Sequence, residues 1–224
     1  MISWARPGIL SRERPLYPLL ILVNVLLASF LTVFASVATI IASSSIQGSL
    51  ALSDTMTVWL TTINLLGANS MVPAGSSLGD RFGYKKMFAI GLILFALSTV
   101  LVATAENVVT ILAGRLIEGF GTGLIFPVGL SLIVQNTTSK QRPLALILYM
   151  AAIFGGGFAF GLPFSAYLTQ FASWRSIFYL IFILSIVSTL ICWLAQEETE
   201  RKNSSKFDIW GFLSFIGFFA LILI

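Results

Sequence analysis

The stretch Ser76-Ser77-Leu78-Gly79-Asp80-Arg81-Phe82-Gly83-Tyr84-Lys85-Lys86 places charged residues and glycines between two long apolar runs. A polar joint in this position is typical of a connection between two membrane-spanning helices. Gly83 permits the positive backbone dihedral that a tight turn between antiparallel helices often needs. Asp80 and Arg81 can satisfy exposed helix ends, and Lys85 is expected where the cytoplasmic leaflet holds basic side chains. The stretch therefore predicts a tight turn on the cytoplasmic side of a membrane.

The composition of the whole chain agrees with this interpretation. Hydrophobic residues make up 57% of the 224 residues and charged residues only 10%, and the mean hydropathy is +0.96. Such values predict an integral membrane protein, so the lipid bilayer is the first expected partner. The net charge of +4 lies mostly in the short connections, which favours membrane topology over nucleic-acid binding.

Few side chains are available for chemistry. Histidine is absent and Cys192 is the only cysteine, so we expect no disulfide within the chain, no metal site and no cofactor. Neither clustered acids nor a nucleophile paired with a base is visible, so the sequence does not predict an enzyme. Function must depend on polar groups inside the apolar runs.

Six apolar runs and an incomplete seventh approach or exceed the roughly 20 residues that a helix needs to cross the hydrocarbon core. Long continuous runs lack the alternation of barrel strands, so the predicted fold is all-α, a polytopic membrane helix bundle. The predicted parts are a cytoplasmic segment at 1–15, six helices at 16–195, a cytoplasmic linker at 196–207 and a truncated seventh helix at 208–224. The six helices are expected at 16–42, 54–78, 86–105, 108–134, 143–168 and 173–195.

Lys and Arg residues are unevenly distributed among the connections. Three lie in 1–15, three in 79–86, two in 135–143 and three in 196–207, whereas 43–53 and 169–172 contain none. The positive-inside rule therefore predicts a cytoplasmic N-terminus. The first apolar run is longer than the roughly 7 to 15 residues of a signal peptide core, which predicts an uncleaved first helix.

Polar residues inside the first two spans are candidates for lining a cavity. Thr32 and Ser36 share one helical face with Ser29 and Thr39, and this face either lines a cavity or forms a small-residue contact between helices. In the second span, Asn64 and Asn69 either shape a substrate path or bond to a neighbouring helix, because an amide in the membrane needs a partner. Asp54 begins that span and is interpreted as its cap.

Arg115 and Glu118 lie three residues apart on one helical face within an apolar run. A charge in the membrane costs about 2.5 kcal/mol or more, and such a residue is usually functional. Two interpretations remain open: a static ion pair that neutralises Arg115, or a carboxylate that exchanges protons. In the fifth span, Gly157 and Gly161 remove bulk and Pro163 leaves a backbone carbonyl unpaired, so this helix is expected to flex.

These motifs resemble those of the major facilitator superfamily. The stretch from Ser76 is similar to the family signature G-x-L-a-D-R-x-G-R-K-x, matches it at Leu78, Asp80, Arg81, Gly83 and Lys85, and departs from it at Ser76 and Tyr84. The fourth span resembles the motif L-x-x-x-R-x-x-Q-G-x-G, whose arginine is linked to proton coupling in the family; it matches at Arg115, Gly119 and Gly121, and Glu118 replaces the glutamine.

Other motifs resemble the drug:proton antiporter branch with fourteen helices. The sixth span opens with Trp174-Arg175-Ser176-Ile177-Phe178, similar to the W-R-x-x-F of that branch, and Arg175 is expected to reach lipid headgroups. Two departures matter. Alignment of the first span on Thr32 puts Phe30 where the branch usually has an aspartate, and the fifth-span proline is shifted by one, to Pro163. One hypothesis is therefore that Glu118 supplies the missing carboxylate, and the alternative is still a static ion pair that neutralises Arg115.

The resemblance implies one half of a transporter, working by alternating access across the cell inner membrane. It implies export of small lipophilic or cationic compounds driven by the proton gradient, with Arg115 and Glu118 in coupling. The implied cytoplasmic gating loop contains Asp80, Arg81, Gly83 and Lys85. Since the last run stops inside the membrane, we expect a homodimer or a missing C-terminal half as partner. The alternative is a truncated fragment that does not transport, but associates with or regulates a full-length transporter.

Overall fold

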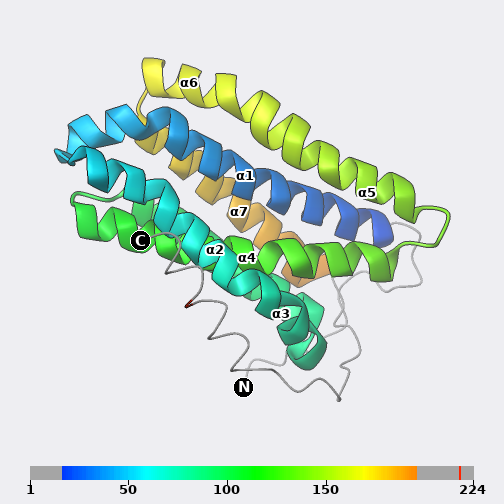
Figure 1. Cartoon of the computed structure of the whole chain (residues 1–224). Helices are drawn as coiled ribbons and strands as arrows, with labels where there is room; N and C mark the ends of the chain where they lie inside the picture. Colours follow the sequence, from blue (N-terminus) through cyan, green and yellow to red (C-terminus); the bar gives the residue numbers. More distant parts are fainter. Residues whose placement is uncertain (1–16, 196–216, 218–224) are drawn as a thin grey trace.

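The computed structural model describes residues 17–195 and residue 217, and almost all of them are helical. The segments are α1 (Tyr17–Leu50), α2 (Asp54–Phe82), α3 (Tyr84–Ala103), α4 (Val108–Asn136), α5 (Arg142–Ala151), the π-helix η1 (Ala152–Phe160), α6 (Gly161–Phe171) and α7 (Trp174–Ala195). Because α5, η1 and α6 follow one another without a break, this part of the chain forms six long helical rods in one bundle (Figure 1). The predicted segments 1–15 and 196–207, and the seventh span apart from residue 217, lie outside the described residues.

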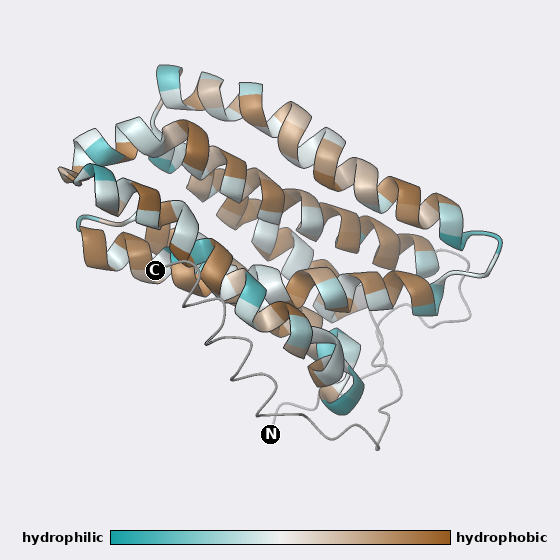
Figure 2. Ribbon diagram, viewed as in Figure 1, coloured by the Kyte–Doolittle hydropathy of each residue, from teal (hydrophilic) through white to brown (hydrophobic). Residues whose placement is uncertain are grey.

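The prediction of an all-α membrane bundle is confirmed. Five of the helical rods are long and apolar enough to cross a membrane. The sixth, α2, has 29 residues, or about 44 Å of helix, and is long enough to span although it is more polar. Figure 2 shows apolar residues along the middle of the rods and hydrophilic residues gathered at their ends.

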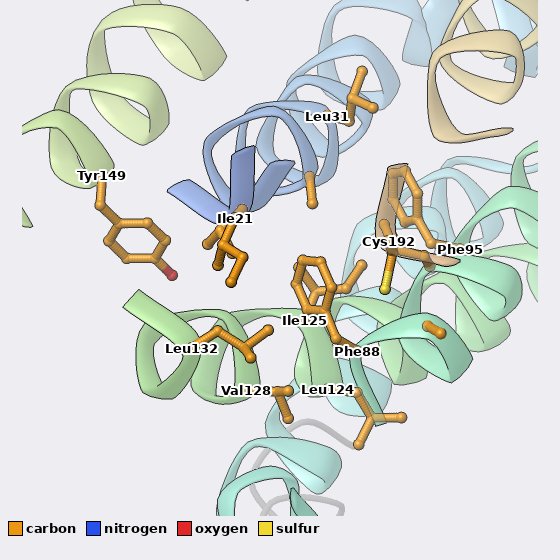
Figure 3. Close-up of a cluster of buried hydrophobic side chains, with 14 of the residues drawn as sticks. Ile21, Leu31, Phe88, Phe95, Leu124, Ile125, Val128, Leu132, Tyr149 and Cys192 are labelled. Carbon is orange, nitrogen blue, oxygen red and sulfur yellow. The ribbon is translucent and has the colours of Figure 1, made fainter. Parts of the chain in front are cut away.

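A cluster of buried apolar side chains joins α1, α3, α4, α5 and α7 (Figure 3). Leu31 of α1, Phe88 and Phe95 of α3, and Ile125 of α4 are fully buried, and Cys192 of α7 closes one side. Lipid tails are as apolar as these side chains, so the cluster stabilises the bundle by close packing more than by removal from water.

The connection between α1 and α2 differs from the prediction. Helix α1 continues to Leu50 instead of ending near residue 42, because its last turns bury Ile46 against Trp174 and Phe178. The cap of α2 is Ser53, whose side chain accepts a hydrogen bond from the Met56 amide at 3.3 Å. Interpreting Asp54 as the cap was therefore wrong. Asp54 lies in the first turn and accepts a hydrogen bond from Gln47 at 2.6 Å.

The joint between α2 and α3 is shorter than predicted. Helix α2 runs to Phe82 and α3 begins at Tyr84, so Gly83 alone separates them. Gly83 has φ 99°, which confirms the predicted positive dihedral, and its amide donates to the Gly79 carbonyl at 2.9 Å. The proposed gating loop therefore consists of the last turn of α2, Gly83 and the first turn of α3. A glycine in this conformation makes additional loop residues unnecessary.

Candidate functional site

Arg115 and Glu118 form a completely buried ion pair on α4. Nη1 of Arg115 lies 2.6 Å from Oε1 of Glu118, and both side chains are 0% exposed. Nε of Arg115 donates to the Leu60 carbonyl of α2 at 3.1 Å, and Nδ2 of Asn64 donates to the Arg115 carbonyl at 3.1 Å. The pair therefore connects α4 to α2. Its hydrogen bonds and opposite charges offset the cost of burying charged groups in apolar surroundings.

Glycines bring α2 and α4 close enough to form this junction. A Cβ atom at Gly119 would collide with the Asn64 carbonyl oxygen, and one at Gly123 would collide with the Ala68 carbonyl oxygen. On α2, a Cβ at Gly67 would lie 2.6 Å from the carbonyl oxygen of Leu116. Such backbone-to-backbone approach is typical of membrane helices with small residues at the contact.

The same helix also packs closely against α3. A Cβ at Gly121 would lie 2.9 Å from the Gly91 carbonyl oxygen and 2.9 Å from the Phe95 amide nitrogen. A Cβ at Gly114 would lie 2.8 Å from the Val102 side chain. Because α4 is packed tightly on both sides, the rotation of Arg115 and Glu118 about its axis is fixed.

Three polar atoms on this face of α4 have no hydrogen-bond partner. They are Nη2 of Arg115, Oε2 of Glu118 and Oγ1 of Thr122. Thr122 is 7% exposed, whereas the ion pair is fully buried. The sequence analysis did not select Thr122. Its signal was positional, since it lies four residues after Glu118 and seven after Arg115, and so on the same face.

The hydroxyl residues of α1 bond mainly to their own helix. Thr32 donates to the Ser29 carbonyl at 2.9 Å, Ser36 to the Thr32 carbonyl at 3.1 Å and Thr39 to the Ala35 carbonyl at 3.0 Å. Thr32 and Thr39 are buried and Ser36 is half-buried, so in this conformation the face of α1 lies mostly within helix contacts. Of the two alternatives in the sequence analysis, this arrangement favours the small-residue contact.

The asparagines of α2 have different surroundings. Asn64 bonds to the neighbouring helix through the Arg115 carbonyl, one of the two roles considered for it, and is 3% exposed. Asn69 is half-buried one turn further along α2. The structure thus brings Asn64, but not Asn69, into hydrogen-bond contact with α4.

Charged residues around Gly83 form a compact corner between α2 and α3. The Tyr84 hydroxyl donates to Oδ1 of Asp80 at 2.9 Å, and the guanidinium of Arg81 lies 5.2 Å from the centre of the Phe82 ring. Lys85 is only 4% exposed, and its Nζ donates to the Trp193 carbonyl of α7 at 3.4 Å. The Lys85 side chain is therefore held by the end of α7 inside the bundle. The carbonyls at the end of α7 attract its ammonium group into the bundle.

The fifth rod is irregular before its proline. Residues 152–160 form the π-helix η1, and Pro163 follows in the exposed face of α6. A Cβ at Gly157 would lie 2.6 Å from Cβ of Val33, and one at Gly161 would lie 3.0 Å from the Phe34 ring. The glycines therefore provide the close contact with α1. π-helical turns are often found at functional sites, so the predicted flexing is best assigned to η1.

Aromatic residues surround the position where an acid was expected. Phe30 stacks with Phe34 at a centroid distance of 5.6 Å, and the Phe160 ring lies 6.4 Å from the Phe30 ring.

The Arg175 guanidinium, expected at lipid headgroups, lies 4.3 Å from the Trp174 ring centre and donates to the Ala105 carbonyl at 2.8 Å. A stacked, hydrogen-bonded site within the chain therefore satisfies the guanidinium. The fold and its buried ion pair define a multi-pass membrane protein.

Comparisons with known proteins identify the family. The family model described as Major Facilitator Superfamily matches residues 25–224. The major facilitator superfamily multidrug transporter mfsC of Aspergillus fumigatus is 32% identical over 207 residues, which are 91% of this chain and 39% of that relative. The puromycin resistance protein pur8 of Streptomyces alboniger is 30% identical over 193 residues, 86% of this chain and 38% of that relative.

A solved structure gives the same result for the fold. The D-xylose-proton symporter superposes with a TM-score of 0.69 at 18% sequence identity, over 81% of this chain and 49% of that chain. The chain belongs to the Major Facilitator Superfamily, as the sequence motifs indicated. It spans 39% and 38% of the length of the two relatives described above.

Proposed function

We propose that this chain forms one half of a proton-coupled exporter of small lipophilic or cationic compounds. The observation that carries the proposal is the buried pair on α4, in which Oε1 of Glu118 is held by Arg115 while Oε2 has no partner. A carboxylate with one fixed and one available oxygen is suited to taking up and releasing a proton. The relatives named for multidrug transport and puromycin resistance support the substrate class.

Proton uptake by Glu118 would change the junction between α2 and α4. While Glu118 is ionised, Arg115 is neutralised by it and also bonds to the Leu60 carbonyl. When Glu118 is protonated, the charge of Arg115 has no counterion, and the two helices favour another arrangement. In this way the protonation state of one residue biases the equilibrium between two conformations, which is what coupling requires.

Two other features support a moving bundle. The π-helix η1 packs its glycines on α1 and provides a place where the fifth rod can change its register. At the corner between α2 and α3, Asp80, Arg81 and Lys85 surround the single turn residue Gly83 and form a latch between neighbouring helices. We place this corner on the cytoplasmic side of the cell inner membrane, since the basic residues Arg81, Lys86, Lys140 and Arg142 lie at the connections α2–α3 and α4–α5, which alternate with connections that contain no Lys or Arg.

Transport needs a path between this bundle and a second one. In the proposed mechanism the two bundles rock against each other about a substrate site between them. The second bundle is either another copy of this chain or a C-terminal half.

Reconstituted vesicles provide the test. Vesicles that contain this chain alone, and others that also contain a full-length relative, are loaded with a fluorescent lipophilic cation and given a proton gradient. Gradient-driven export that is lost in Glu118→Gln supports the proposal. Export unchanged by Glu118→Gln would show that the pair is static, and export solely in the presence of the relative, unaffected by Glu118→Gln, would indicate a regulatory fragment.

A further inference from the structure

Three unpartnered polar atoms gather on one face of α4. Arg115, Glu118 and Thr122 occupy positions i, i+3 and i+7, which lie within about 60° of one another around a helix. Nη2 of Arg115 is a donor, Oε2 of Glu118 is an acceptor, and Oγ1 of Thr122 can be both. Buried polar groups without partners are rare, so three on one face indicate a shared partner in the functioning protein.

Helix α1 also packs against this side of α4, beside α2, whose Leu60 carbonyl accepts from Arg115. A Cβ at Gly129 of α4 would lie 2.9 Å from Cγ1 of Val25, which fixes where the two helices meet, and they run in opposite directions (Figure 1). In antiparallel helices, residues the same number of positions away from a contact, forward on one helix and backward on the other, lie at the same height. Thr32 is therefore level with Thr122, and Ser36 is level with Glu118. The hydroxyl face of α1 and the charged face of α4 are thus two sides of one polar layer.

Thr32 and Ser36, the hydroxyl residues of α1 level with this group, do not supply the missing partners by donating hydrogen bonds. The hydroxyl groups of Thr32 and Ser36 donate to carbonyls of their own helix at 2.9 Å and 3.1 Å. Their oxygen atoms keep lone pairs that accept hydrogen bonds. A small molecule that both donates and accepts is therefore needed between the helices, and water is the molecule with this chemistry.

We propose that this polar layer holds an ordered water bound by Glu118, Arg115 and Thr122, and that Thr122 relays protons to and from Glu118. The water donates to Oε2 of Glu118, accepts from Nη2 of Arg115 and bonds to Oγ1 of Thr122. Thr122 as a residue is 7% exposed against 0% for the ion pair, although its Oγ1 is itself buried. The Thr122 end is thus the less deeply buried end of the group, and the proposed relay runs from Glu118 toward it.

The relay step conserves protons and charge. When Glu118 releases its proton to the water, the water passes one of its own protons to Oγ1 of Thr122, and Thr122 passes its original hydroxyl proton to a second water that reaches Oγ1 from the solvent. Uptake is the reverse sequence, and each group ends with its starting number of bonds. Among the described residues that pack here, Leu60 and Asn64 of α2, Phe95 of α3, and Thr32 and Ser36 of α1 are neutral, so Arg115 is the charge that acts on Glu118.

This inference rests on the proposed proton uptake by Glu118, and the experiment separates the two. The full chain is placed in lipid nanodiscs, and the infrared band of the protonated Glu118 carboxyl is followed after a pH jump. Glu118→Gln identifies the band by removing it. If no band disappears in this variant at any pH, the carboxyl does not titrate, and both the proposed function and the relay are wrong.

Thr122 variants test the relay itself. Thr122→Val has nearly the same shape but no hydroxyl, and should slow the appearance of the Glu118 band by about tenfold, the factor expected from one hydrogen bond to a charged group. Thr122→Ser keeps the hydroxyl and should retain the original rate. An unchanged rate in Thr122→Val, with Glu118 still titrating, would overturn the relay and leave the proposed function intact.

The unsubstituted chain provides a check that does not depend on the folding of any variant. In the difference spectrum between protonated and ionised Glu118, an internal water gives an O–H stretching band that shifts when the solvent is H2(18)O. Observation of this shift supports the water site. Absence of such a band while Glu118 titrates would overturn it.

Discussion

Arg115 divides its guanidinium between two helices, with Nη1 2.6 Å from Oε1 of Glu118 on α4 and Nε donating to the Leu60 carbonyl on α2. The residue therefore has a structural role in addition to any role in coupling. Since Asn64 of α2 also donates to the Arg115 carbonyl, the connection between the helices is formed from both sides.

Removal of Arg115 should destabilise the bundle more than removal of the charge of Glu118. Arg115→Ala leaves a buried carboxylate without its counterion, which costs about 3–5 kcal/mol of the free energy of unfolding. Glu118→Gln keeps an oxygen that accepts from Nη1 and should cost less. The double variant Arg115→Ala with Glu118→Gln should be more stable than Arg115→Ala alone, as measured by denaturant unfolding in detergent micelles. Strict additivity of the single changes would show that the pair is not coupled.

Added side-chain bulk at the contact between α2 and α4 should be equally informative. Gly119→Ala and Gly123→Ala force a Cβ onto backbone carbonyls of α2, and each should lower the free energy of unfolding by about 1–3 kcal/mol. Gly155→Ala is the matched control, because a Cβ there meets no atom within 4 Å. It should leave the stability unchanged or raise it by up to about 1 kcal/mol. Equal losses at Gly119 and Gly155 would contradict a role for close helix contact.

Much of this architecture could be predicted because membrane helices leave a simple signature. Long apolar runs predicted six rods, and Gly83 predicted the positive dihedral at the turn between α2 and α3. The pairing of Arg115 with Glu118 followed from their spacing of three residues, since no other charge is near them in the sequence. These features are local, so the amino-acid sequence determines them directly.

Other features depend on contacts between distant segments. Lys85 lies in a stretch typical of a headgroup region, and only the position of the end of α7 shows why it is buried. The same holds for Arg175, whose hydrogen-bond acceptor is the carbonyl of Ala105 in another connection. In the sequence, nothing distinguishes Thr122 from other threonines in apolar runs, and only the structure shows that its hydroxyl has no hydrogen-bond partner. The π-helix η1 was not predicted, because glycine and proline indicate irregularity but not its type.

The stability of the bundle end that contains Arg175 should depend on the guanidinium group of this residue as well as on its charge. Arg175→Lys keeps a positive charge but loses the planar group that stacks on Trp174 and donates to the Ala105 carbonyl. We expect a loss of about 1–2 kcal/mol in the free energy of unfolding. Arg81→Lys is the matched control, because Arg81 is exposed and lies beside a single ring, and it should cost less than about 1 kcal/mol. A larger loss at Arg81 than at Arg175 would contradict this assignment.

The single cysteine can report whether Lys85 holds the end of α7 in place. Cys192 is fully buried beside the Lys85 carbonyl, and the Lys85 ammonium donates to the carbonyl of the next residue, Trp193. A maleimide should therefore label the folded chain slowly, at the rate of local opening. Lys85→Met removes the ammonium group while keeping the length of the side chain, and it should accelerate labelling by about fivefold, the factor for roughly 1 kcal/mol. Lys86→Met removes a neighbouring charge outside this contact and should leave the rate unchanged. If both variants label at the rate of the unsubstituted chain, Lys85 does not hold α7; if both accelerate equally, the effect is one of charge at this corner and does not depend on the contact with Trp193.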